Sequence, residues 1–184
     1  MKQQITKNAI EAAFLKLLRE RYFEKVMVKD IVEECGLTRN TFYYYYEDTY
    51  NIIEDITTRE VERLIANMKP GDSFFDLASD TLEYFDEYPM VAKHVFDSSK
   101  KEEIYRYVRS AMDVVIRKYI GMQDSAFSRS YGTLSKEERN RMSRICQYIL
   151  RGLIDDWLSQ GMTYSLKEEM NNLKDLYDIF MNRR

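Results

Sequence analysis

Apolar residues recur at helical spacing along most of the chain. Residues 5–20 predict an amphipathic helix, and residues 28–35 predict a short second helix whose apolar side chains share one face. Gly36 ends that helix where left-handed backbone is tolerated, and Thr38 is a suitable N-cap for a third helix at 39–45. Two short helices joined by a turn that contains glycine are the layout of a DNA-reading helix-turn-helix motif.

Six further helices are predicted in the rest of the chain. They lie at about 48–68, 73–87, 90–97, 101–119, 135–160 and 165–182. Pro70 and Gly71 are the strongest break between elements, and the Gly- and Ser-rich residues 121–134 predict a loop. No strand pattern is convincing, so the expected fold class is all-α with about nine helices. We expect residues 1–47 to form a helix-turn-helix DNA-binding domain and residues 48–184 to form a helical body.

Charge is divided along the chain. The 184 residues have a net charge of −3, which argues only weakly against a nucleic-acid partner. The first 29 residues carry seven basic and three acidic side chains, so this segment has a net charge of +4 and the rest has −7. A DNA reader needs a local basic surface rather than a basic whole, so this division fits a DNA-binding head on an acidic body.

The sequence lacks the patterns of an enzyme, a metal site or a membrane protein. Cys35 and Cys146 match no zinc spacing, and the single histidine, His94, has no ligand partner at a suitable spacing. There is no Gly-rich phosphate loop, no GxSxG and no HExxH. No apolar run approaches the roughly 20 residues that span a bilayer. We therefore expect a cytoplasmic protein that is not an enzyme and holds no cofactor or metal.

The second and third predicted helices carry a recognisable motif. Residues 28–53 read VKDIVEECGLTRNTFYYYYEDTYNII, in which the motif positions are Gly36, Leu37, Thr38, Thr41, Phe42, Tyr43, Tyr45, Tyr46 and Ile52. This segment resembles the N-terminal signature of TetR-type (TetR/AcrR) transcriptional regulators. Residues 152–162, GLIDDWLSQGM, also resemble the C-terminal domain of the branch that includes regulators of dihydroxyacetone kinase genes. The resemblance implies a homodimer that binds a double-stranded DNA operator and responds to a small molecule.

Two positions depart from the signature. Met27 stands where many members have a threonine that caps the second helix, so we expect that helix to begin less firmly. Thr49 stands where many members have a lysine that touches a phosphate. The absence of this lysine removes one charge-assisted contact and should lower the salt dependence of DNA binding by about one ion.

The candidate DNA contacts lie on the third predicted helix and at the starts of the second, third and fourth. They are Lys29, Thr38, Arg39, Asn40, Thr41, Tyr43, Tyr45 and Thr49. Arg39 can bind guanine and Asn40 adenine through paired hydrogen bonds, each discriminating by roughly 1–3 kcal/mol. The alternative for the first three residues of the third helix is a solvated turn with no DNA contact.

Four consecutive tyrosines follow Phe42. A helix turns about 100° per residue, so Phe42 and Tyr46 share the inner face and are expected in the core. Tyr43 and Tyr45 are expected to project toward the DNA groove or its phosphate walls, as the resemblance implies. Tyr44 is expected to be partly buried in a packing role. The alternative for the whole run is a packing platform.

Aromatic residues are abundant in the middle of the chain. Most belong in the core, but the resemblance implies an effector pocket between helices. Its candidate lining is Tyr84, Tyr88, His94, Tyr107, Met112 and Tyr148. For His94, a packed or surface position is the more common alternative.

The last two predicted helices carry long apolar stripes. Such stripes fit a helical seam, either inside one subunit or, as the resemblance implies, in a four-helix interface between two subunits. The candidate interface residues are Ile149, Gly152, Leu153, Trp157, Leu173, Leu176, Tyr177 and Phe180. The expected function is a repressor that binds an inverted-repeat operator as a dimer. The alternative is an activator or co-regulator that acts mainly through a protein partner.

Overall fold

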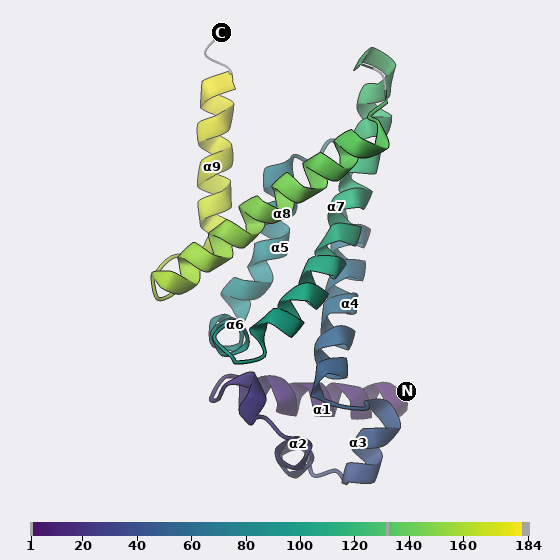
Figure 1. Ribbon diagram of the computed structural model, residues 1–184, viewed down its shortest axis with the longest axis vertical. Helices are drawn as coiled ribbons and strands as arrows, with labels where there is room; N and C mark the ends of the chain where they lie inside the picture. Colours follow the sequence, from purple (N-terminus) through teal and green to yellow (C-terminus); the bar gives the residue numbers. More distant parts are fainter. Residues whose placement is uncertain (1, 132, 182–184) are drawn as a thin grey trace. The chain divides into compact units, whose positions relative to one another are not determined.

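The computed structural model describes residues 2–131 and 133–181, with side chains at 3–124 and 133–181 (Figure 1). Its elements are α1 (Lys2–Leu18), a 3-10 helix η1 (Phe23–Lys25), α2 (Val28–Cys35), α3 (Arg39–Tyr45), α4 (Thr49–Asn67), α5 (Phe74–Glu87), α6 (Pro89–Phe96), α7 (Lys101–Tyr131), α8 (Lys136–Ser159) and α9 (Leu166–Met181). The described part of the chain thus holds nine α-helices and no strand, which confirms the all-α prediction. The predicted bounds of α2 and α3 are confirmed at both ends.

The predicted loop at 121–134 is wrong over most of its length, because α7 continues to Tyr131. The apolar face of α7 continues through Ile116 and Ile120, both 1% exposed, to the buried Asp124. Arg139 forms an ion pair with Asp124 at 2.7 Å, which offsets part of the cost of burying that carboxylate. Burial on this face overrides the low helix propensity of Gly121. Residue 132 of the predicted loop lies outside the described residues.

The chain divides into two compact units. Unit 1 contains Met1–Arg59 and Tyr88–Val108, and unit 2 contains Glu60–Glu87 and Arg109–Arg184. Both α4 and α7 therefore pass from one unit to the other. The functional boundary after residue 47 stays a prediction.

Unit 1 is built around the face that α1 presents to α2 and α3. Figure 1 shows α1 lying across these two short helices. Phe14, Ile31 and Phe42 are fully buried there. Helix α6 joins this unit, because the Nδ1–H of the buried His94 donates to the carbonyl oxygen of Leu18 at 2.7 Å.

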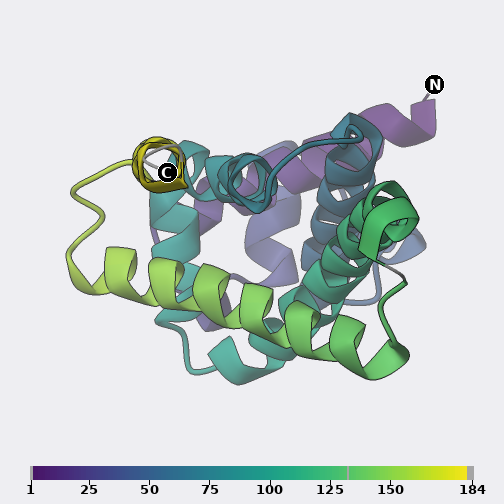
Figure 2. The same cartoon turned by 90° about the horizontal axis from the view of Figure 1, so that it is seen from above.

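In unit 2, α5 and α9 lie side by side in both views (Figures 1 and 2). Two ion pairs join these helices, Lys174 with Asp76 and Lys167 with Glu83, each at 2.5 Å. A separate apolar cluster joins α4, α5 and α7 through Leu64, Leu77 and Val115. No helix in the described ranges is long and apolar enough to cross a membrane.

The Asp86 carboxylate, near the end of α5, caps the start of α9. It accepts hydrogen bonds from the Ser165 hydroxyl at 2.7 Å and from the N–H groups of Leu166 and Lys167 at 2.9 Å each. We expect Asp86→Ala to lower the free energy of unfolding by about 1–2 kcal/mol, because N-terminal N–H groups of α9 lose their acceptor. Urea unfolding followed by circular dichroism measures this. Glu87→Ala, at an exposed neighbouring position, is the control. Equal losses in the two variants would contradict the capping role.

Candidate nucleic-acid interface

The turn between α2 and α3 depends on Gly36 and Thr38. Gly36 has φ 67°, a left-handed conformation that strains other residues, and the N–H of Leu37 donates to the carbonyl of Val32 at 2.9 Å. Thr38 Oγ1 then accepts the N–H of Thr41 at 3.1 Å and caps α3. These local bonds set where α3 begins.

The inner face of α3 is formed by Phe42 and Tyr46, which are 0% and 5% exposed. Tyr46 donates its hydroxyl hydrogen to Asp55 on α4 at 2.8 Å. Lys7 on α1 donates to the same carboxylate at 2.9 Å and lies 5.2 Å from the Tyr46 ring centroid. A second ion pair, between Arg59 and Glu11, also joins α4 to α1. Tyr46 and Asp55 therefore connect three helices.

This contact changes the acidity of both partners. Burial, then the hydrogen bond to Asp55, raises the pKa of Tyr46 far above its ordinary value. For Asp55, burial acts in the opposite direction, but the hydrogen bonds from Lys7 and Tyr46 and the charges of Lys7 and Arg59 prevail. They hold the pKa of Asp55 below its ordinary value of 3.8. The carboxylate is therefore charged at neutral pH.

The outer face of α3 is open to solvent. Arg39 and Asn40 are exposed at its start, and the Tyr43 side chain is 56% exposed. The expected partial burial of Tyr44 is wrong, since it is 71% exposed. The reason is geometric, because Tyr44 lies two residues, about 200° of helix turn, from the buried Phe42. Tyr45 is half-buried, with its ring 4.9 Å from that of Tyr44.

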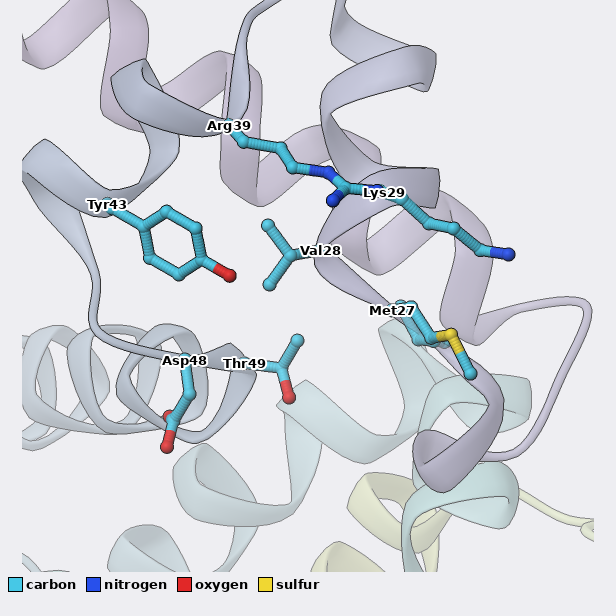
Figure 3. Close-up of a pocket in the computed structure, with 8 residues that line it drawn as sticks. Met27, Val28, Lys29, Arg39, Tyr43, Asp48 and Thr49 are labelled. Atoms are coloured by element: carbon cyan, nitrogen blue, oxygen red, sulfur yellow. The ribbon is translucent and has the colours of Figure 1, made fainter.

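The starts of α2, α3 and α4 line a shallow groove of about 380 Å³ (Figure 3). Its walls are Val26, Met27, Val28, Lys29, Arg39, Tyr43, Asp48 and Thr49. Figure 3 shows the Tyr43 hydroxyl and the Thr49 side chain pointing toward Val28. Four of the eight predicted contacts meet in this groove, namely Lys29, Arg39, Tyr43 and Thr49. The other four, Thr38, Asn40, Thr41 and Tyr45, are not part of its lining.

Sequence reasoning missed the apolar wall and the acidic rim of this groove. Val28 lies on the predicted helix at 28–35 and Asp48 begins the one predicted at about 48–68, and both line the groove. The signal for Asp48 was its place beside Thr49. At the start of α2, Met27 provides no side-chain cap, but Asp30 accepts the N–H of Met27 at 3.1 Å, which is one half of a capping box.

The six candidate effector residues are divided between the two units. Three of them lie in unit 1. The ring centroids of His94 and Tyr22 are 5.0 Å apart, and the Arg19 guanidinium lies 5.7 Å from the ring centroid of Tyr88. The Tyr107 hydroxyl donates to the carbonyl oxygen of Glu54 at 3.2 Å. In unit 2, Met112 packs against the cluster of Leu64, Leu77 and Val115, while Tyr84 is half-buried and Tyr148 is 63% exposed. The groove described above includes none of the six. The effector pocket stays a prediction.

Most of the candidate interface residues on α8 and α9 are exposed. The exposed fractions are 44% for Ile149, 36% for Leu173, 56% for Leu176, 50% for Tyr177 and 75% for Phe180. Gly152 is also exposed, and Leu153 is half-buried. Five further apolar side chains on these two helices are also exposed, namely Met142, Ile145, Tyr148, Ile179 and Met181.

Trp157 differs from the other candidate interface residues. Its side chain is 1% exposed, and its Nε1–H donates to the carbonyl of Tyr164 at 2.8 Å. It packs within its own unit, because its large ring is already covered and its one polar group is satisfied.

The exposed start of α3, its buried inner face and the glycine turn together form a helix-turn-helix DNA-binding domain. The family model described as bacterial regulatory proteins, tetR family, matches residues 10–56. A second model, described as a transcriptional regulator C-terminal region, matches residues 72–178. The chain belongs to the TetR family of transcriptional regulators. It has a DNA-binding domain and a C-terminal regulatory domain, in a family that is generally not enzymatic.

Known proteins resemble the chain in sequence or in fold. Over 75 residues it is 36% identical to an uncharacterised HTH-type transcriptional regulator, YxbF, of Bacillus subtilis; this covers 40% of the chain and 18% of that relative. Its fold is similar to the dihydroxyacetone kinase operon activator DhaS, with TM-score 0.66, 22% identity, and 94% and 93% of the two chains covered. It is also similar to FadR of Bacillus subtilis, solved with stearoyl-CoA, with TM-score 0.69, 13% identity and coverages of 91% and 95%.

The lowered pKa of Asp55 predicts a pH-dependent contribution to stability. A carboxylate whose pKa is depressed in the folded state stabilises it above the ordinary value of 3.8, and the contribution is lost as the pH falls through the folded-state pKa. We expect Asp55→Asn to lower the free energy of unfolding at pH 7 by about 1 kcal/mol, a figure reduced for solvent screening. The difference from wild type should shrink once the pH falls below 3.8.

Urea unfolding at a series of pH values measures this difference. Glu62→Gln, at an exposed position on the same helix, is the control. If the free energies of unfolding of Asp55→Asn and wild type differ by the same amount from pH 7 to below 3.8, the ion-pair account is contradicted.

Proposed function

We propose that this chain is a dimeric repressor that binds an inverted-repeat DNA operator and releases it when a small molecule binds its body. The main support is the groove at the starts of α2, α3 and α4, in which Arg39 and Lys29 lie beside the exposed face of α3. A helix whose first turn is exposed and carries hydrogen-bonding side chains suits the major groove of DNA. We expect a regulator that acts on DNA to work in the bacterial cytoplasm.

The contacts divide into those that read bases and those that hold the backbone. Arg39 and Asn40 are exposed at the start of α3 and are proposed to read base edges. Lys29 on α2 is proposed to bind phosphate. Thr38 and Thr41 are already joined by a hydrogen bond of 2.9 Å between their hydroxyls, so their proposed contacts are to phosphate or to a thymine methyl group.

Of the three remaining candidates, Tyr43 and Thr49 line the groove and Tyr45 lies outside its lining. Tyr43 is proposed to reach a base edge or a phosphate with its hydroxyl, and Tyr45 a phosphate. Thr49, where the family signature has lysine, is proposed to make an uncharged contact. The groove therefore offers the backbone fewer charges than the signature implies.

The exposed apolar side chains of α8 and α9 support the dimer. Regulators of this family act as dimers. Isolated apolar residues are common on protein surfaces, but ten large ones on two helices form a surface that favours burial against a partner. A two-fold dimer would present its two α3 helices one DNA turn, or a multiple of it, apart. The operator would then be an inverted repeat.

The effector and the sign of regulation are further parts of the proposal. FadR, whose fold is similar, was solved with stearoyl-CoA, which favours a small-molecule effector for this chain as well. Such an effector would act through different affinities for the DNA-bound and free arrangements, with a coupling of about 1–3 kcal/mol. DhaS is described as an operon activator. This supports the alternative, an activator or co-regulator that works mainly through a protein partner.

Replacing Arg39 tests the DNA-reading role. We expect Arg39→Ala to weaken binding to the operator by about 1–3 kcal/mol and to weaken binding to random DNA much less, because the side chain reads bases. Titrations against the intergenic DNA beside the gene, with a random duplex for comparison, measure both. Arg106→Ala removes an exposed arginine of α7 and is the matched control. Equal losses on the two duplexes would show that Arg39 contacts only the backbone.

Placing a charge on α8 or α9 tests the dimer. We expect Ile149→Glu and Phe180→Glu each to raise the dimer dissociation constant on the order of 100-fold or more, since each buries two carboxylates in the seam. Light scattering coupled to size-exclusion chromatography measures the mass. Ile5→Glu is the control, at a 63% exposed isoleucine on α1. A dimer that survives both seam variants would exclude this interface.

A further inference from the structure

The side chains of Asp48 and Asn51 accept backbone hydrogen bonds at the start of α4. Asp48 Oδ1 accepts the N–H groups of Tyr50 at 2.8 Å and Asn51 at 3.1 Å. In return, Asn51 Oδ1 accepts the N–H groups of Glu47 at 3.0 Å and Asp48 at 3.3 Å. The start of a helix attracts phosphate when its N–H groups are available. Here four backbone donors around the helix start already have acceptors from the chain itself.

The same carboxylate carries a negative charge at the groove. Asp48 lines the groove together with Lys29 and Arg39. Figure 3 shows its carboxylate turned away from Val28, and the two hydrogen bonds above hold it over the first turn of α4. Its neighbour Thr49 supplies no positive charge. The edge of the groove beside α4 therefore carries the charge of Asp48 and no basic side chain from the groove lining, where the proposed function brings a DNA phosphate.

We propose that Asp48 limits the affinity of the head for the DNA backbone. The inference rests on the proposed function, because it assumes that DNA occupies the groove. Phosphates are the same in every sequence, so the repulsion lowers affinity for operator and random DNA alike. Occupancy then depends more on the base contacts of Arg39 and its neighbours. When the affinity for the DNA backbone is low, an effector coupling of a few kcal/mol is enough to release the DNA.

The variant Asp48→Asn separates charge from helix capping. Asparagine caps a helix as well as aspartate does, so α4 should keep its first turn. The probe is a random-sequence DNA duplex, and the measurement is fluorescence anisotropy at about 50 and 200 mM salt. We expect the variant to bind about three- to tenfold more tightly at low salt, from the loss of one charge several ångströms from a phosphate. The gain should shrink at high salt through screening.

Two further variants complete the experiment. Glu47→Gln is the matched control, because Glu47 is an exposed neighbouring carboxylate that is not part of the groove lining. It should change the affinity much less than Asp48→Asn does. Thr49→Lys restores a positive charge at the same edge and should steepen the dependence of log K on log salt by about one.

Each outcome is decisive. Equal binding by Asp48→Asn and wild type, or an equal gain in Glu47→Gln, overturns the proposal. An unchanged salt slope in Thr49→Lys overturns it too, because this edge would then not face the backbone. If the wild type and all three variants bind no duplex at any salt concentration, the proposed function itself is wrong and the inference falls with it.

Discussion

The contact of Tyr46 with Asp55 determines how the DNA-binding head is assembled. Tyr46 follows α3, Asp55 lies on α4, and Lys7 of α1 reaches both the carboxylate and the face of the tyrosine ring. Phe42, one turn earlier, is fully buried on the same face of α3. Arg39 and Tyr43 lie beside this buried face, where their exposed side chains line the groove. Packing of the neighbouring inner face therefore fixes the position of the proposed reading surface on a seven-residue helix that would be marginal by itself.

The electrostatics of the groove explain how an acidic chain can act on DNA. The basic excess lies in the first 29 residues, and Lys29 at its end lines the groove. Asp48 and Thr49 reduce the charge on the other wall. A head of this kind would depend on base contacts more than on general attraction to phosphate, and would hold random DNA weakly. Weak attraction to phosphate suits a regulator that must leave its operator when effector binding weakens DNA binding by only a few kcal/mol.

The sequence predicted local structure best where single residues control it. Gly36 and Thr38 mark the end of α2 and the start of α3, and both helices have the predicted bounds because their signals are local. The continuation of α7 could not be predicted, because it depends on tertiary packing, namely burial of Ile120 and the pairing of Asp124 with Arg139. The covered ring of Trp157 likewise depends on the chain that follows it, through Tyr164. Helical spacing identifies an apolar stripe, but it does not show whether the stripe is buried by the same chain or by a partner.

The central claim is that the exposed start of α3 reads DNA sequence in a two-fold arrangement. Selection of binding sites from a random duplex library with the purified full chain tests this most directly. The account predicts an enriched inverted repeat whose half-sites are centred one helical turn, or a multiple of it, apart. It also predicts that Arg39→Ala loses discrimination at one position of each half-site. Enrichment of no motif, or of a single asymmetric site, would contradict it.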